Sequence, residues 1–373
     1  MGGLAVYFIQ TKSAISMELV ILSELNPDNT HVGWSVSRSL ESVLATTCNP
    51  KFIYPVQNKP IHPCLKYQNR IFKSWYKLPS QPILDLKDNS KPKILLIICL
   101  TPGFLLSIHS LGPLINQFDL KVAYLLDGYS IDTFDRSVVP HLDHIFAICR
   151  ETSDKIKKNL GLNSSFLPLG IDTLKYGSKQ SDRPIDIFGY GRKDSFVHQH
   201  LIASYNHLES DRFYYFTSFT GAHVENVEHH TCLHHRLLSK SKISLCFEAS
   251  SVPRFQGYSP ILYRWFEGWA AGCTLVGRRP FGEGTDALMN WENSTIEVPD
   301  NKEHWSDFFE NLLNDQDTLT ANRHRNHREC LDRHDWRYRI QQIFEGLNLT
   351  PPQTLKDQID QLQNYTYSFS KNA

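Results

Sequence analysis

Short apolar runs alternate with helix-like segments along most of the sequence, and this alternation constrains the fold more than any other feature. The runs are rich in β-branched and aromatic residues, as buried strands are. Amphipathic segments such as 33–45 and 151–161 lie between them. Strands that alternate with helices form parallel sheets covered by helices. The strands predicted in the first half are 18–23, 51–56, 93–100, 121–126, 144–149 and 165–170.

A polar stretch at 173–184, dense in Lys, Ser, Gly, Asp and Pro, interrupts the alternation and is typical of a linker. The chain has 373 residues, which is enough for two domains with cores of their own. Strands are predicted again at 185–191, 212–218, 242–249, 273–277 and 294–299. We therefore expect an α/β protein with two parallel-sheet domains, divided as follows: extension 1–16, first domain 17–175, linker 176–184, second domain 185–347, and a polar helix with a tail at 348–373.

Charge and cysteine content exclude some classes of function. Lys plus Arg and Asp plus Glu both number 39, so no overall field attracts nucleic acid, and we expect no nucleic-acid partner. The eight cysteines show no paired spacing, which favours reduced thiols in a cytoplasmic protein. No apolar run predicts a transmembrane segment or a signal peptide. A peripheral contact with a membrane surface is left open.

The stretch 258–277, YSPILYRWFEGWAAGCTLVG, places two charges in a run crowded with aromatic residues. Ser259 and Pro260 predict a helix start, with Ser as the N-cap and Pro at the first helical position, and Gly272 predicts its end. Arg264 and Glu267 are three residues apart and share one face of this helix. One interpretation is an ordinary ion pair on a helix surface, worth a few tenths of a kcal/mol.

The other interpretation is a ligand site. Ligands of open α/β sheets bind beyond the carboxyl ends of the strands, at the N-termini of helices. The backbone N–H groups of Gly257, Tyr258 and Ser259 are then placed to bind phosphate groups. The carboxylate of Glu267, further along the helix, is placed to accept hydrogen bonds from two neighbouring ribose hydroxyls. This arrangement suits a sugar nucleotide.

The segment 266–276 closely resembles the nucleotide-sugar signature of the glycosyl transferases group 1, and its Arg264-x-Phe266-Glu267 form is most similar to the CgeB-type branch. Three further segments resemble landmarks of that family in the family's order: 166–177, 185–194 with Gly191-Arg192, and 334–347. The resemblance implies the GT-B fold, in which two Rossmann-like domains face each other across a cleft. It also implies transfer of a sugar from a nucleotide-sugar donor, held by the C-terminal domain, to an acceptor on the N-terminal domain.

Transfer from such a donor requires positive charge near the departing diphosphate. We identify no metal motif such as Asp-x-Asp on a loop, so we predict neither a metal nor a cofactor, and side chains and helix dipoles must supply the charge. Arg192 and Lys193 are the leading donor-binding candidates, the alternative being a solvated loop pair. Arg264 either reaches the diphosphate or orients Glu267. Ser259 stands where the family carries a further glutamate that contacts the transferred sugar.

The first domain contributes two candidates. Asp127 follows the strand at 121–126 and is predicted to be catalytic, as a base on an acceptor hydroxyl or as a ligand of the donor sugar. The alternative is an Asp-Gly turn. Gly33 matches in type the family's glycine loop, which lets the backbone approach the donor phosphates, and is otherwise a turn glycine.

Two polar segments have alternative interpretations. His230, Cys232 and His234 have a spacing that suits zinc, but no further ligand group has matching spacing, which favours an exposed helix for the paired histidines at 229–230 and 234–235. The basic stretch 322–339 suggests RNA or a membrane surface, yet its placement before the closing helix favours a solvated helix face.

The sequence as a whole predicts a metal-independent glycosyltransferase, with retention of configuration expected from the resemblance. Its acceptor is undefined: a glycan, a lipid-linked sugar, a protein or a small molecule. Two alternatives on the same fold stay open, namely a non-catalytic protein that binds sugar nucleotides or glycans, and a nucleotide-sugar epimerase. An NAD-dependent dehydrogenase is disfavoured because no Gly-x-Gly-x-x-Gly follows the first strand.

Overall fold

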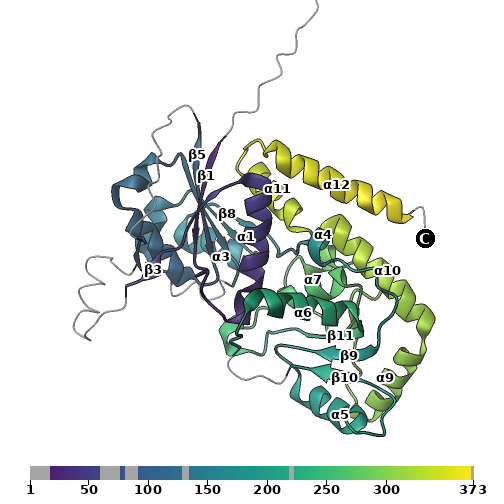
Figure 1. Cartoon of the computed structure of the whole chain (residues 1–373). Helices are drawn as coiled ribbons and strands as arrows, with labels where there is room; N and C mark the ends of the chain where they lie inside the picture. The colour runs from purple at the N-terminus through teal and green to yellow at the C-terminus, as the bar shows by residue number, and fades with distance from the viewer. Residues whose placement is uncertain (1–16, 59–75, 80–90, 128–133, 218–221, 371–373) are drawn as a thin grey trace, which may run out of the picture.

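A computed structural model of the chain describes residues 17–58, 76–79, 91–127, 134–217 and 222–370. The extension predicted at 1–16 lies outside the described residues. Two parallel sheets stand side by side, with helix α1 (Ser35–Cys48) between them (Figure 1). This arrangement confirms the predicted class of two Rossmann-like parallel-sheet units.

The first sheet has six parallel strands in the order β2-β1-β5-β6-β7-β8. Its central strand β5 is buried along its whole length, as expected for a parallel strand covered on both faces. Every strand predicted in this half is present, although β2 ends three residues before the predicted boundary. The bounds are Glu18–Ser23 (β1), Lys51–Ile53 (β2), Lys93–Cys99 (β5), Leu120–Leu125 (β6), His144–Ala147 (β7) and Ser164–Phe166 (β8).

The second sheet has five parallel strands in the order β10-β9-β11-β12-β13. The predicted strands of this half are again present, several of them shorter than expected. Their bounds are Ile185–Gly189 (β9), Tyr214–Phe216 (β10), Ser241–Phe247 (β11), Thr274–Arg278 (β12) and Ile296–Glu297 (β13). A separate antiparallel pair joins β3 (Val56–Gln57) to β4 (Tyr76–Lys77).

Helices cover both sheets (Figure 1). The helix α3 (Arg150–Leu160) ends as predicted, because Gly161 adopts the left-handed conformation (φ 67°) that suits a C-terminal stop. The other α-helices of the described residues, besides α1, are α4 (Thr173–Tyr176), α5 (Ser195–Tyr205), α6 (Val227–Ser239), α7 (Tyr263–Ala270), α8 (Thr285–Leu288), α9 (Trp305–Asn314), α10 (Gln316–Arg333), α11 (Trp336–Gly346) and α12 (Gln353–Ser370). The 3₁₀ segments are η1 (Val32–Trp34), η2 (Pro102–Gln117), η4 (Arg136–His141), η5 (Pro253–Phe255) and η6 (Lys302–His304).

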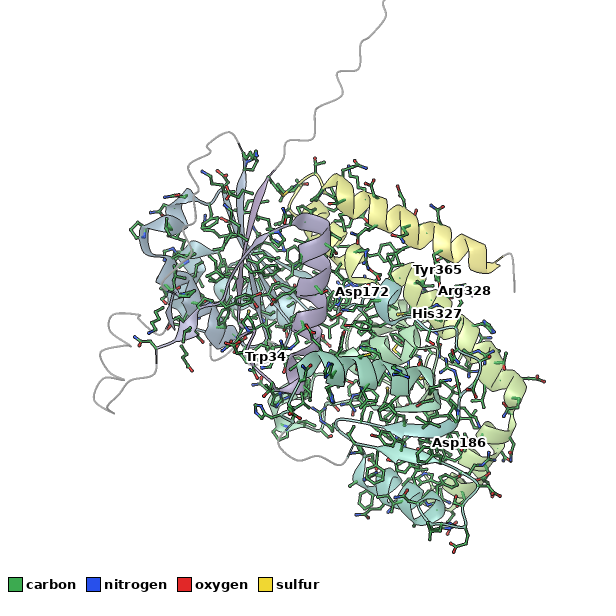
Figure 2. All side chains as sticks on the ribbon, in the orientation of Figure 1. Trp34, Asp172, Asp186, His327, Arg328 and Tyr365 are labelled. Carbon is green, nitrogen blue, oxygen red and sulfur yellow. The ribbon has the colours of Figure 1, made fainter. Side chains whose placement is uncertain are left out.

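The chain passes between the two sheets twice, and the two crossings lie side by side. Ile171, on the way to the second sheet, forms an isolated bridge with Asp335, on the way back. The guanidinium of Arg337 binds Asp172 at 3.0 Å and Asp335 at 2.9 Å, and Figure 2 shows Asp172 at this junction. Helix α11 then packs on α1, where the indole of Trp336 donates to Ser39 Oγ at 3.0 Å.

Each sheet reverses its strand order once, between β1 and β5 in the first and between β9 and β11 in the second. Loops that leave the carboxyl ends of strands at such a reversal form the ligand crevice of open α/β sheets. None of the described helices has the length and apolar character needed to cross a membrane. The seven cysteines in the described part of the chain are unpaired thiols.

Candidate functional site

A cavity of about 980 Å³ lies where the two strand-order reversals face each other. The second sheet contributes the loops after β9 and β11 and the start of α7, and the first sheet contributes the loop after β1 and the ends of its central strands. We name this space the main cavity. Its volume is at the upper end of the range usual for ligand sites, roughly 300–1,000 Å³. The sequence-predicted residues that line it are Gly33, Asp127, Gly191, Arg192, Lys193, Arg264 and Glu267.

Glu267 lies in the wall of the main cavity and is 5% exposed. Its helix is held in place by two buried tryptophans: Trp265 donates to Thr295 Oγ1 at 2.9 Å and Trp269 to the Ser294 carbonyl at 2.8 Å. The carboxylate contacts His234 of α6, with 3.3 Å between Oε1 and Nε2. Burial alone would raise the pKa of Glu267, but the charge and hydrogen bond of His234, with a smaller contribution from a hydrogen bond of Tyr190, bring the pKa below its usual value. The carboxylate is therefore ionised and faces the cavity.

His234 was missed as a functional residue by the sequence analysis. The histidines of α6 were expected on an exposed helix, and this expectation holds for His229 but is wrong for His234, whose side chain is only 13% exposed. His234 also lines the cavity and meets the ring of Tyr190 edge-on at 4.5 Å. The four-residue spacing of His230 and His234 put both on one helix face, which was the available signal.

Arg264 does not pair with Glu267. Its guanidinium donates to the carbonyls of Tyr190 (3.4 Å) and Arg192, so it fixes the loop that follows β9. Gly191, in that loop, has a φ of 59°, and a Cβ there would lie 3.0 Å from Arg264 Nη2. The charge in the middle of the aromatic helix thus shapes the cavity wall.

Cations dominate the main cavity. Arg192 and Arg254 both lie over the ring of buried Phe255, at 5.0 and 4.7 Å from its centroid, which holds the two guanidinium groups on the wall. Lys193 donates to the Thr217 carbonyl at 3.0 Å, and burial and the neighbouring Arg264 lower its pKa. The charged lining residues are Arg192, Lys193, Arg254 and Arg264 against Asp127 and Glu267. This excess of positive charge suits an anionic ligand.

Asp127 reaches the main cavity from the carboxyl end of β6, with a side chain 20% exposed. Its Oδ2 lies 3.2 Å from Nη1 of Arg254, which belongs to the other sheet's loop. The pair therefore bridges the two halves of the molecule across the cavity.

Gly33 lies in η1, directly before α1. Its N–H donates to His31 Nδ1 at 2.9 Å, and a Cβ on Gly33 would lie 2.8 Å from the same ring. Trp34, Ser35 and Val36 also line the cavity, and Figure 2 shows Trp34 at the end of α1 that lies nearest the second sheet. The positive end of the α1 dipole thus faces the main cavity.

The predicted start of α7 is wrong: the helix begins at Tyr263, with Leu262 as its N-cap, three residues after Pro260. Ser259 is not available as a cap, because its buried hydroxyl donates to Glu248 Oε2 at 2.9 Å and accepts from the Phe281 N–H at 3.2 Å. Gly257, Tyr258 and Ser259 do not line the main cavity. Leu262, Tyr263 and Arg264 do line it, so the start of α7 meets the cavity later in the sequence than expected.

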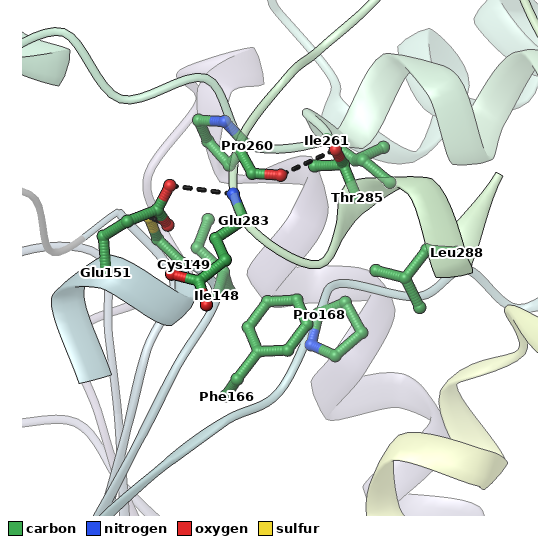
Figure 3. Close-up of a pocket in the computed structure, with 11 residues that line it drawn as sticks. Ile148, Cys149, Glu151, Phe166, Pro168, Pro260, Ile261, Glu283, Thr285 and Leu288 are labelled. Carbon is green, nitrogen blue, oxygen red and sulfur yellow. Dashed lines mark hydrogen bonds between the residues drawn. The ribbon is translucent and has the colours of Figure 1, made fainter. Parts of the chain in front are cut away.

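Residues 260–261 instead enter a packed seam between the two halves (Figure 3). The cavity in this seam measures only about 10 Å³, which is no more than the room needed by a single water. Across it the carboxylate of Glu151 accepts the Glu283 N–H at 2.8 Å. No phosphate group fits this space.

The remaining predicted segments have ordinary surroundings. Among the described residues no three His, Cys, Asp or Glu side chains gather closely enough to hold a metal ion. In the basic stretch 322–339, the prediction of a solvated helix face holds for Arg325, which pairs with Glu292 at 2.8 Å, and for Arg328, which pairs with Glu329 at 3.3 Å. It is wrong for Arg337 and Arg339, which are buried where the chain returns to the first sheet.

Comparisons with known proteins agree with this geometry. Residues 182–345, somewhat less than half of the chain, match the model of a family described as glycosyl transferase-like. The match contains Arg264 and Glu267. No curated protein matches the chain.

Solved structures resemble the whole chain at low identity. HepE from Anabaena, in complex with UDP-glucose, aligns with a TM-score of 0.51 and 12% identity over 89% of this chain and 99% of its own. An alpha-glucosyltransferase in complex with UDP and a mismatched DNA 13-mer aligns with a TM-score of 0.52 and 12% identity, over 89% of this chain and 100% of its own. The chain has the GT-B fold.

A third similar structure is the N-terminal domain of trehalose-6-phosphate phosphatase from Candida albicans, with a TM-score of 0.54 and 12% identity over 93% of this chain and 99% of its own. At such identity the likeness establishes the architecture. The resemblance to the CgeB-type branch stays a prediction.

Proposed function

We propose that this chain is a glycosyltransferase that takes a sugar from a nucleotide-sugar donor bound in the main cavity. One observation carries the proposal: an ionised, buried carboxylate on α7 and a group of cations share one cavity at the strand-order reversals of a GT-B fold. Function has to be argued from such a site because a fold hosts many activities. The predicted division into domains at 175 and 185, the hexosyl type, the retention of configuration and the metal independence belong to the proposal.

In this proposal the donor extends from the carboxylate of Glu267 to the cationic side chains of the main cavity. Glu267 accepts hydrogen bonds from the two ribose hydroxyls, and the contact with His234 keeps it ionised and oriented. Arg192 and Lys193 neutralise the diphosphate. The N–H groups at the start of α7, from Leu262 onward, complete the phosphate contacts, taking the role that the sequence suggested for Gly257, Tyr258 and Ser259.

Across the cavity, the start of α1 with Gly33 covers the donor from the first domain. Asp127 accepts the proton of the acceptor hydroxyl as that oxygen bonds to the anomeric carbon from the same face that the diphosphate leaves, which retains the configuration. The bond from this carbon to the diphosphate oxygen breaks, and the nucleoside diphosphate leaves with the electron pair. Arg254, which holds Asp127 in the structure, turns to the departing phosphate and releases the carboxylate.

A screen with UDP-, GDP-, ADP- and dTDP-sugars tests the proposal on the full chain. A ligand that binds the native state raises the melting temperature in proportion to the logarithm of its concentration over Kd. We expect one nucleotide series to do so, and the matching donor to be hydrolysed or transferred, as followed by chromatography of the released nucleotide. Tight binding with neither transfer nor hydrolysis would support the non-catalytic alternative. Absence of binding by all four series would contradict both.

A further inference from the structure

A second cavity, of about 1110 Å³, lies on the other side of the wall formed by α1 and α6. We name it the side cavity. It is lined by the loop after β1, one face of α1, the chain at 52–54, the crossing at 175–178 and one face of α6 along its whole length. Several residues line both cavities, among them Ser35, His235 and Tyr263, so a thin wall separates the two spaces. Nothing in the proposed donor site uses the side cavity.

Aromatic rings stand at two places in the lining of the side cavity. On the first-domain wall Phe52 and Tyr54 are stacked, with 6.0 Å between centroids and 1° between planes. Elsewhere in the lining, from the crossing and from α6, the rings of Tyr176 and His235 are stacked with 3.8 Å between their centroids. Burial lowers the pKa of His235 to about 3, so this ring is uncharged at neutral pH. Flat, uncharged rings at two places in the lining offer surfaces for a ring-shaped ligand with apolar faces.

The floor of the side cavity is polar. Glu41 is 6% exposed and accepts hydrogen bonds from Ser23 Oγ at 2.5 Å and from the Tyr54 hydroxyl at 3.0 Å. Two shielded nitrogens, Arg38 Nε and His235 Nδ1, have no partner within the described residues. Both atoms are shielded from solvent, so they lie behind the surface of the cavity and the ligand contacts must come from the exposed polar groups of the lining. Hydroxyl and amide side chains complete the lining: Asn29, Thr30, Ser35, Ser39, Ser42, Asn226, Thr231 and Ser239.

The charge of the side cavity is nearly balanced. Its charged lining residues are Asp28, Glu41, Glu225 and Glu228 against Arg38, Lys175 and Arg236. No excess of positive charge attracts a phosphorylated or otherwise anionic ligand, in contrast to the main cavity. Many hydroxyl and amide groups beside aromatic faces suit a ligand with many hydroxyl groups and apolar ring faces, which is a neutral sugar chain.

We propose that the side cavity binds the acceptor, and that the acceptor is a neutral oligosaccharide. This inference rests on the proposed glycosyltransferase function, because it needs a donor in the main cavity. The sugar rings lie against the Phe52–Tyr54 and Tyr176–His235 pairs. The two cavities adjoin at Ser35 and Tyr263, which line both of them. There the end of the acceptor that receives the new sugar enters the main cavity.

The exposed thiol of Cys232 on α6 offers a direct test, since it lines the side cavity alone. The rate at which iodoacetamide modifies Cys232 is measured by mass spectrometry. It is measured in the presence of neutral trisaccharides of glucose, galactose, mannose or N-acetylglucosamine, of sialyllactose, or of UDP-glucose. We expect one neutral trisaccharide to slow modification in proportion to its occupancy. We expect neither sialyllactose nor UDP-glucose to do so. Protection by the acidic sugar alone, or by none of the trisaccharides, would overturn the proposal.

Two substitutions locate the binding. Tyr54→Ala removes a ring from the wall, and we expect trisaccharide affinity to fall about tenfold or more, as for the loss of roughly 1.4 kcal/mol of contact. Tyr54→Phe keeps the ring and should retain most of the affinity. UDP-glucose affinity is measured on both variants, because intact donor binding separates a failure of this inference from a failure of the proposed function. If the trisaccharide protects Cys232 of the Tyr54→Ala variant at the same concentration as it protects Cys232 of the parent chain, the acceptor binds elsewhere.

Discussion

The main cavity and the side cavity are similar in size and share the wall of α1 and α6, yet their chemistry is opposite. The main cavity has four cationic side chains and two anionic ones. The side cavity has three and four, with stacked rings at two places in its lining. One pair of helices therefore separates a site for a charged ligand from a site for a neutral one.

The two cavities also differ in the pKa of the buried carboxyl group that lines each of them. Glu267 has a histidine beside it, and the pKa of Glu267 falls below its ordinary value despite burial. Glu41 has only neutral donors and the more distant Arg38, so burial raises the pKa of Glu41 to about 7. A buried glutamate thus has a lowered pKa in the main cavity and a pKa near neutral in the side cavity, and the neighbouring side chains cause the difference.

The largest effect is expected from Glu267→Ala. A carboxylate that accepts two hydrogen bonds from ribose contributes about 3 kcal/mol, so donor affinity should fall about 100-fold. Titration calorimetry with UDP-glucose, or with the best nucleotide of the screen, measures the change. Glu209→Ala is the control, because Glu209 is exposed and lines neither cavity. Unchanged donor affinity in Glu267→Ala would show that the main cavity is not the ribose site.

Strand positions and the residues at their carboxyl ends were predictable from the sequence. Apolar runs are local signals, and the rule that ligands bind at these strand ends needs no tertiary detail. It led to Gly191, Arg192 and Asp127, which the structure brings to one cavity. The start of α7 was not predictable, because Ser259 is engaged by Glu248 and Phe281 from other segments.

The partner of Glu267 and the side cavity were also beyond reach. His234 meets Glu267 only because α6 packs on α7; the spacing of His230 and His234 indicated a shared helix face but not this partner. The side cavity arises between helices from different halves of the chain, so no single stretch of sequence encodes it. Residues set by tertiary packing are therefore the ones that sequence patterns miss.

The next effect concerns pH. The pKa of Glu41 is raised in the folded chain to about 7 from an ordinary value of 4.5, so between these values the folded Glu41 holds more protons than the unfolded one. The contribution of Glu41 to stability then falls as pH rises through this window, by on the order of 1–3 kcal/mol. Buried histidines such as His235 and His327, whose pKa values are lowered, contribute with the opposite sign but equally in the parent chain and in Glu41→Gln. The difference in unfolding free energy between the two chains, measured by urea unfolding from pH 5 to pH 8, should therefore change with pH by this amount.

The contribution of Glu267 to stability changes with pH in the opposite direction, because the pKa of Glu267 is lowered in the folded chain. This contribution is present above pH 4.5 and is lost only as the pH falls further. Between pH 5 and pH 8 this carboxylate should therefore leave stability unchanged. A profile that stays equally steep in Glu41→Gln would contradict the assignment of the raised pKa to the side cavity.

The smallest effect is expected from Gly191→Ala. Its φ of 59° costs an alanine about 1–2 kcal/mol, and the new methyl group crowds Arg264 in the main cavity. Gly161→Ala is a matched control, since φ there is 67° and no atom lies within 4 Å of the added Cβ. Both variants should melt a few degrees lower, as seen by calorimetry. Only Gly191→Ala should lose donor affinity, by a few-fold, and an equal loss in both would remove the loop after β9 from the donor site.

The paired chain crossings at Ile171 and Asp335 have a mechanical consequence for both cavities. Two adjoining links between two bodies can act as a joint, and a swing about that joint would leave each sheet intact. Contacts that bridge the bodies elsewhere, such as Asp127 with Arg254 and Glu151 with Glu283, must then separate. Each contact of this kind is worth only about 1 kcal/mol. Large ligands can thus be admitted and products released without unfolding any part of either sheet.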